Sequence, residues 1–272
     1  MNRIQVLTAM TVLVAGCGGG DAPPPSVTTM KPAMQNQPSL DGTVSGLDGR
    51  AMADVEVRLC TADQKCTVTK SDATGAFAFF SLESRYYALS ASRPPDDTGE
   101  YAPIAVPVYV ISDAAPFHSH LVLPHITPGT DLTGGVQTIS INGALTMTVD
   151  GASMTFPDKA PHRISGIRIP PAQFPDFCVP SPMGRVLAMW AFAPSGAHSD
   201  KPIRIHLDDT LGLPPDSNVF VWKIDPVAGR PQQAGGGQVN KAATAIETGA
   251  GLFDDLHDLT WLLIETPGSS GP

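Results

Sequence analysis

The chain has 272 residues, a formal net charge of −9 at pH 7, a hydrophobic content of 42% and four cysteines. This length is sufficient for two domains, each with a core of its own. An acidic chain without a cluster of Lys and Arg argues against nucleic acid as a partner and against electrostatic adhesion to anionic lipid. The apolar residues come in short alternating runs, which favour strands over helices.

The first 17 residues have the pattern of an export signal. Asn2-Arg3 precedes an apolar run from Ile4 to Val14, which is too short to span a bilayer as a folded helix. Small residues then close on Cys17, and this pattern resembles the bacterial lipobox. The resemblance implies that residues 1–16 are a signal peptide and that Cys17 is lipidated. An ordinary cleaved signal peptide, or a start site placed too early, is the alternative.

Residues 17–38 are expected to form a lipidated cysteine followed by a flexible tether, because they are rich in Gly, Pro, Ser and Thr without periodicity. Two or more acyl chains hold a protein at a membrane without a basic patch, so the membrane is the first expected partner. The lipoprotein resemblance also implies sorting. Gly18, rather than Asp, after the cysteine favours the outer membrane of a Gram-negative cell.

The remaining cysteines predict one disulfide. Cys60 and Cys66 stand six apart between alternating strands and are placed to close a hairpin. A loop of this length contributes about 2 kcal/mol in the chain-entropy picture. Cys178 is then left over. We interpret it as a small buried apolar residue, with a reactive thiol as the alternative, because the sequence shows no basic neighbour that would lower its pKa.

Residues 39–124 predict a first β-sandwich. Val55, Val57 and Leu59 share one face of a strand, and Phe77 and Phe79 share one face of another. The quoted residues resemble the carboxypeptidase regulatory-like domain, a transthyretin-like sandwich related to Cna B-type modules; they are Gly42, Val44, Asp48-Gly49, Val55 to Leu59, Ser71 to Phe79 and Tyr87 to Leu89. Such domains serve stability and interaction, and the resemblance implies no catalytic residue. It departs from the family at Glu83-Ser84-Arg85, and no isopeptide triad is predicted.

Residues 125–266 predict a second β-sandwich, followed by a tail at 267–272. Asn142-Gly143 is a hairpin turn signal between two alternating runs, and the apolar run from Arg185 to Phe192 suits a central strand that holds Trp190. This half resembles ZU5-like segments of bacterial surface proteins at Met154 to Asp158, Ala193 to Ala197, Pro202-Ile203, Val219 to Ile224 and Trp261. Residues 252–258 depart from that pattern.

Two clusters contain residue types that bind metals. His118 and His120 share one strand face, and His125 follows closely; three imidazoles suit Zn or Cu, but the spacing supplies no fourth ligand. Asp254, Asp255, His257 and Asp258 form an acidic loop whose oxygen atoms suit Ca²⁺, although no loop geometry is specified. The expected states are an exposed strand face and a solvated loop, so neither a metal nor another cofactor is expected.

The sequence contains no P-loop, dinucleotide fingerprint, HExxH or GxSxG motif. It therefore predicts an all-β protein of two tandem sandwiches, anchored by lipid in the cell envelope, with a structural or adhesion-type role and no catalytic residue. An envelope protein or polysaccharide is the expected partner. The alternatives are a binding lipoprotein for carbohydrate or peptide, as in β-augmentation, and a cell-surface hydrolase that uses the carboxylates of residues 254–258.

Overall fold

The structure is a computed structural model that describes residues 39–93, 100–111, 115–142, 144–175, 184–248 and 256–267. Several sequence-based predictions lie outside these residues, namely the signal peptide, the lipidation of Cys17, the tether, Cys178, Asp254, Asp255 and residues 268–272. The described residues all belong to one compact unit. No helix in the described ranges has the length and apolar character needed to cross a membrane.

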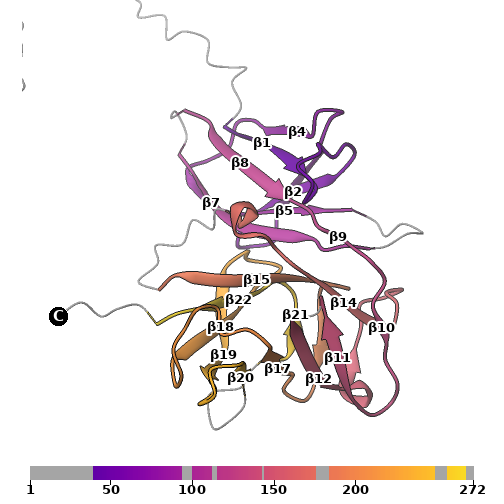
Figure 1. The fold of residues 1–272 in the computed structure, drawn as a ribbon. Coiled ribbons are helices and arrows are strands. Elements are labelled where there is room, and N and C mark those ends of the chain that lie inside the picture. The colour runs from indigo at the N-terminus through magenta and orange to yellow at the C-terminus, as the bar shows by residue number, and fades with distance from the viewer. Residues whose placement is uncertain are drawn as a thin grey trace, which may run out of the picture. The chain divides into compact units, whose positions relative to one another are not determined.

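The first part of the chain forms two main sheets, drawn in indigo to magenta in Figure 1. The three-stranded sheet has the order β4-β1-β8 and the four-stranded sheet the order β3-β2-β5-β7. A small pair, β6 with β9, joins residues 100–101 to residues 125–126. The strands are β1 (Leu40–Ser45), β2 (Glu56–Cys60), β3 (Cys66–Lys70), β4 (Ala76–Phe79), β5 (Arg85–Ser92), β6 (Glu100–Tyr101), β7 (Ile104–Val110), β8 (Phe117–Val122) and β9 (His125–Ile126).

The inner faces of these sheets supply a core of alternating apolar residues. Val57 and Leu59 of β2 are buried, as are Phe77 and Phe79 of β4, while the residues between them are more exposed. The two Phe rings meet edge to face with their centroids 6.1 Å apart. The period-two pattern therefore placed the core residues of this part correctly.

The later part is dominated by a ten-stranded sheet of order β10-β14-β15-β22-β18-β19-β20-β17-β12-β11, with β13-β16-β21 as a separate three-stranded sheet. Two 3-10 helices, η1 (Gly151–Ser153) and η2 (Pro171–Gln173), interrupt the strands. The strands are β10 (Thr130–Asp131), β11 (Val136–Ile141), β12 (Leu145–Asp150), β13 (Met154–Thr155), β14 (Arg163–Arg168), β15 (Val186–Ala193), β16 (Ala197–Ser199), β17 (Arg204–Leu207), β18 (Asn218–Ile224), β19 (Pro231–Val239), β20 (Ile246–Thr248), β21 (Asp258–Leu259) and β22 (Leu262–Glu265).

The all-β prediction is confirmed, since the described regular elements are strands and two 3-10 helices. β15 is a central strand and Trp190 is fully buried, as expected. Thr260 lies between β21 and β22, and its hydroxyl donates a hydrogen bond to the Ile224 carbonyl at 2.8 Å. Residues 231–239 form the longest described strand, β19, which no alternating pattern in the sequence indicates.

Candidate binding face

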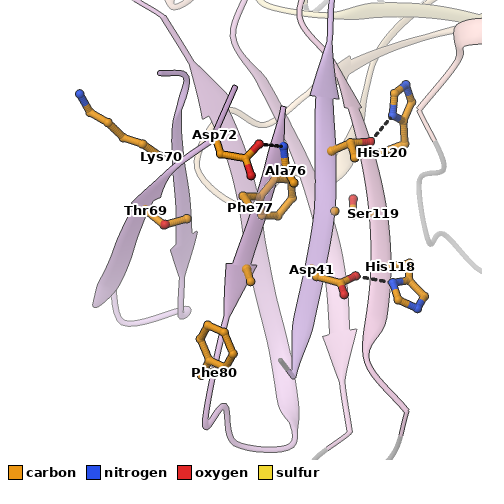
Figure 2. Close-up of a pocket in the computed structure, with 13 residues that line it drawn as sticks. Asp41, Thr69, Lys70, Asp72, Ala76, Phe77, Phe80, His118, Ser119 and His120 are labelled. Carbon is orange, nitrogen blue, oxygen red and sulfur yellow. Dashed lines mark hydrogen bonds and ion pairs between the residues drawn. The ribbon is translucent and has the colours of Figure 1, made fainter. Parts of the chain in front are cut away.

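The outer face of the β4-β1-β8 sheet carries the polar side chains that could form a functional site (Figure 2). β1 and β8 run parallel, and this pairing sets Asp41 opposite His118 and Thr43 opposite His120. Because side chains alternate across a strand, all four lie on the face that points away from the core. The prediction that the two histidines share an exposed strand face is borne out by their positions on β8.

His118 is paired with a carboxylate. Its Nδ1 atom bonds to Oδ1 of Asp41, and Figure 2 shows the two side chains meeting across the β1–β8 pair. The imidazole is 75% exposed, whereas the Asp41 side chain is 28% exposed. The pair is therefore open to solvent on its histidine side, where a hydrogen bond to a carboxylate contributes little to stability.

His120 is held by hydroxyl groups instead. Its Nδ1 lies 2.9 Å from Oγ1 of Thr43, and its Nε2 lies 3.2 Å from Oγ of Ser45. Both ring nitrogens thus have partners on β1. These two contacts fix the orientation of the ring.

A hollow of about 850 Å³ lies beside these residues. The small side chains of Ala76 and Ala78 on β4 leave this space, and Phe80, which is 55% exposed, stands at its margin. Thr69 and Lys70 of β3 add polar groups from the neighbouring sheet. The lining therefore combines hydrogen-bonding groups with one exposed aromatic ring, a composition typical of binding sites.

The turn before β4 shapes one end of the hollow. Asp72 Oδ1 accepts hydrogen bonds from Oγ1 of Thr74 at 2.7 Å, from the Thr74 N–H at 2.8 Å and from the Ala76 N–H at 2.9 Å. These donors, first of all the Thr74 hydroxyl, lower the pKa of Asp72 below its ordinary value. Gly75 adopts φ +77°, a conformation that favours glycine and lets the chain re-enter the sheet.

Gly42 allows β1 and β8 to approach each other. A Cβ atom at this position would lie 2.1 Å from the Ser119 carbonyl oxygen and 2.7 Å from Cζ of Phe77. Both distances are shorter than real Cβ contacts. Gly42, which is one of the residues that carry the family resemblance, is therefore required because no larger side chain fits between the Ser119 backbone and the Phe77 ring.

The arrangement does not form a nucleophilic triad. Such a triad needs a hydroxyl and a carboxylate on the same imidazole. Here the carboxylate is bound by His118 and the hydroxyls by His120. Within the described ranges no group of three His, Cys, Asp or Glu residues is placed to hold a metal ion, and His125 lies apart, with its ring 5.0 Å from that of Tyr101.

The second predicted cluster is only partly described. Asp258 lies on β21 and accepts a hydrogen bond from Nδ1 of His198 at 2.7 Å, while Lys223 Nζ bonds to its other oxygen. Burial alone would raise the pKa of Asp258, but the hydrogen bonds from Lys223 and His198 outweigh it and lower that pKa. His257 Nδ1 lies 2.7 Å from the Ser199 carbonyl oxygen. Asp258 is thus an ion-paired carboxylate, which is unsuited to act as a general acid.

The predicted disulfide is present between Cys60 and Cys66, which are directly opposite each other on β2 and β3. Sequence reasoning missed a second exposed aromatic group. Tyr86 and Tyr109 face each other on β5 and β7 with ring centroids 4.6 Å apart, and the Arg230 guanidinium lies 5.4 Å from the Tyr86 centroid. The alternation of both strands could have indicated that these two rings point outward.

No protein-family profile matches the chain, and no curated protein sequence matches it. Among solved structures it is similar to the major pilin subunit of Bacillus cereus and to an aspartate-to-alanine variant of that subunit, each at 11% identity and a TM-score of 0.27. Each alignment covers 86% of this chain, which spans 59% of the pilin. At this TM-score the likeness carries no argument about function.

Proposed function

We propose that this chain is a lipid-anchored protein of the cell envelope that acts by binding and not by catalysis. The observation that carries the proposal is the outer face of the β4-β1-β8 sheet. It presents His118 and His120 beside an open hollow, yet the partners of each imidazole lie within the sheet and make no catalytic set. Such a face suits recognition of a ligand by hydrogen bonds.

Two features support the envelope location. The lipobox-like pattern at Cys17 supplies the proposed anchor. The disulfide between Cys60 and Cys66 fits a protein that folds in an oxidising compartment. The outer membrane is the proposed location if the cell is Gram-negative. A carboxypeptidase regulatory-like β-sandwich at residues 39–124 and a ZU5-like β-sandwich at residues 125–266 are also part of the proposal.

A second candidate is a binding lipoprotein for carbohydrate or peptide. It is favoured by Phe80, whose exposed ring borders a hollow lined by hydroxyl, carboxylate and ammonium groups. An aromatic ring beside hydrogen-bonding groups provides an apolar surface together with specificity. The two candidates differ in whether the ligand is a small saccharide or peptide, or a large envelope component.

The anchor is tested with the full chain expressed in a bacterium that is fed radiolabelled palmitate. We expect label and membrane retention for the natural chain and for Cys178→Ser, and loss of both in Cys17→Ser. Retention of Cys17→Ser in the membrane fraction would remove the anchor from the proposal.

The binding face is tested by pull-down from native envelope and on saccharide and peptide arrays. We expect the natural chain to capture a ligand, and we expect this capture to be lost in two variants. Phe80→Ala removes the exposed ring, and Thr43→Lys places a long side chain in the hollow beside β1. Val68→Ala, an exposed change on β3, is the matched control. Equal capture by all four proteins would exclude this face, and turnover of any array compound would contradict the non-catalytic role.

A further inference from the structure

Two tyrosine rings lie side by side on the outer face of the β3-β2-β5-β7 sheet. Tyr86 of β5 stands directly opposite Tyr109 of β7, and their ring centroids are 4.6 Å apart with 53° between the ring planes. Their strand neighbours Tyr87 and Val110 are buried, so alternation directs the two rings to solvent. Tyr86 is 57% exposed and Tyr109 is 44% exposed, and Ile111, two residues further on, is also exposed.

The Arg230 side chain reaches this pair from a distant part of the chain. Its guanidinium carbon lies 5.4 Å from the centre of the Tyr86 ring, within the range of a cation–π contact. Arg230 is itself exposed, and among the described residues its guanidinium has no carboxylate partner. A positive charge without a counter-charge therefore stands beside two exposed aromatic rings.

The turn between β18 and β19 keeps Arg230 at this position. Gly229 adopts φ +66°, and a Cβ atom there would lie 2.7 Å from the carbonyl carbon of Val106. The backbone of the turn is therefore pressed against the backbone of β7. Because Arg230 is the next residue, its side chain starts beside the tyrosine pair.

The same turn explains why Arg230 has no ion pair. Asp225 carries the carboxylate nearest to it in sequence, but Oδ1 accepts hydrogen bonds from the Val227 N–H at 2.8 Å and the Ala228 N–H at 2.9 Å. The Gln232 amide donates to Oδ2 at 2.8 Å. The turn itself thus uses both oxygen atoms of Asp225.

We propose that Tyr86, Tyr109 and Arg230 form a second binding site, whose ligand is a saccharide that carries a carboxylate. Each tyrosine offers a flat apolar face with a hydroxyl at its rim, and a pyranose ring matches this with a face of C–H bonds and hydroxyls around its edge. The planar fork of a guanidinium matches a carboxylate, so the free charge of Arg230 favours an acidic sugar over a neutral one. The Asp and Glu side chains of an acidic peptide have no flat face that would cover two adjacent rings.

This inference goes beyond the proposed function, because the site and the hollow beside His118 lie on different sheets. Either one can fail without the other. A single sugar unit on an open sheet face buries little surface, so we expect weak binding of one unit. A polymer of such units meets many copies of the chain at once, which raises the overall avidity where copies are concentrated on one surface.

Surface plasmon resonance tests the ligand class with the full chain in detergent. The chain is passed over immobilised polygalacturonate, alginate and hyaluronan, over the carboxyl-reduced form of each polymer, and over polyglutamate. The reduced polymers keep the sugar rings without the charge, and polyglutamate keeps the charge without the rings. We expect binding to at least one acidic polysaccharide and at least tenfold weaker binding to its reduced form and to polyglutamate.

Three variants then test the site. Tyr86→Ala and Arg230→Gln should each weaken binding to the acidic polysaccharide at least tenfold. Arg50→Gln, which removes a charge from an 88% exposed side chain in another turn, is the matched control and should bind as the natural chain does. Far-UV circular dichroism establishes that all three fold.

Several results would overturn the proposal. They are a lack of binding to all three acidic polysaccharides, equal binding to the reduced polymer, and equal binding to polyglutamate, which would assign the site to acidic peptides. Undiminished binding by Tyr86→Ala or Arg230→Gln would also refute it. Loss of binding in Phe80→Ala alone would place the saccharide on the β4-β1-β8 face instead.

Discussion

Replacing both Cys60 and Cys66 by serine should destabilise the folded protein by about 2 kcal/mol. The bridge spans a sequence separation of six, and in the chain-entropy picture closing so short a loop in the unfolded state is worth about 2 kcal/mol at 25 °C. The hairpin has its own restraints, because the Thr61 N–H bonds to the Lys65 carbonyl at 3.0 Å and the Gln64 N–H to the Thr61 carbonyl at 2.9 Å. β2 and β3 therefore stay paired in the folded variant. The loss of stability arises because the unfolded chain without the disulfide has more conformational entropy.

The assay is urea unfolding followed by tryptophan fluorescence, with thermal unfolding alongside. For a compact unit of this size, about 2 kcal/mol lowers the melting temperature by about 4–8 °C. Adding a reductant should lower the melting temperature of the natural protein by the same amount, and it should leave the melting temperature of the double variant unchanged. An unaltered unfolding midpoint in the variant would refute the reasoning, since it would mean that β3 opens independently of the remaining sheet.

Three further changes probe the face, the ion pair and the core. Gly42→Ala should destabilise by about 2 kcal/mol or more, since its Cβ would overlap the Ser119 carbonyl; loss of ligand capture without a change in urea midpoint would contradict this. Asp258→Asn should cost about 1–2 kcal/mol at pH 7, and the difference from the natural protein should start to shrink below about pH 4 and disappear as pH falls through the lower pKa of the folded protein, because a carboxyl with a lowered pKa stabilises only while ionised. A difference that does not shrink at all as pH falls through this acid range would argue against it. Burial raises the pKa of Glu265, so the natural protein should lose stability as pH rises through and above the ordinary glutamate range, and Glu265→Gln should be more stable at pH 7. Parallel stability–pH curves for the two proteins would show that Glu265 has no such effect.

The sequence was most informative where one face of a strand is buried. Val57 and Leu59, or Phe77 and Phe79, alternate with exposed residues, and this local period determines both the strand and its inner face. β19 escaped prediction because Gly235, Gly236 and Gly237 carry no such pattern. They extend because β18 and β20 pair with them on either side.

The sequence pattern predicted the two histidines of the candidate site but not the residues that they contact. Alternation placed His118 and His120 on one face, but it could not supply their partners. Asp41 and Thr43 are 77 residues away in the sequence and are brought alongside by the parallel β1–β8 pairing. Register between distant strands depends on the packing of the whole core, which a local pattern does not contain.

The parallel pairing of β1 and β8 has a mechanical consequence. The chain enters β1 at Leu40 and leaves β8 after Val122, at opposite ends of the same six registered pairs. A stretching force between the amino-terminal segment and the residues that follow β8 would draw the two strands past each other along their length. All the hydrogen bonds between them would then be loaded together and not peeled apart one by one, which makes this pair a shear clamp suited to a protein that is pulled from both sides.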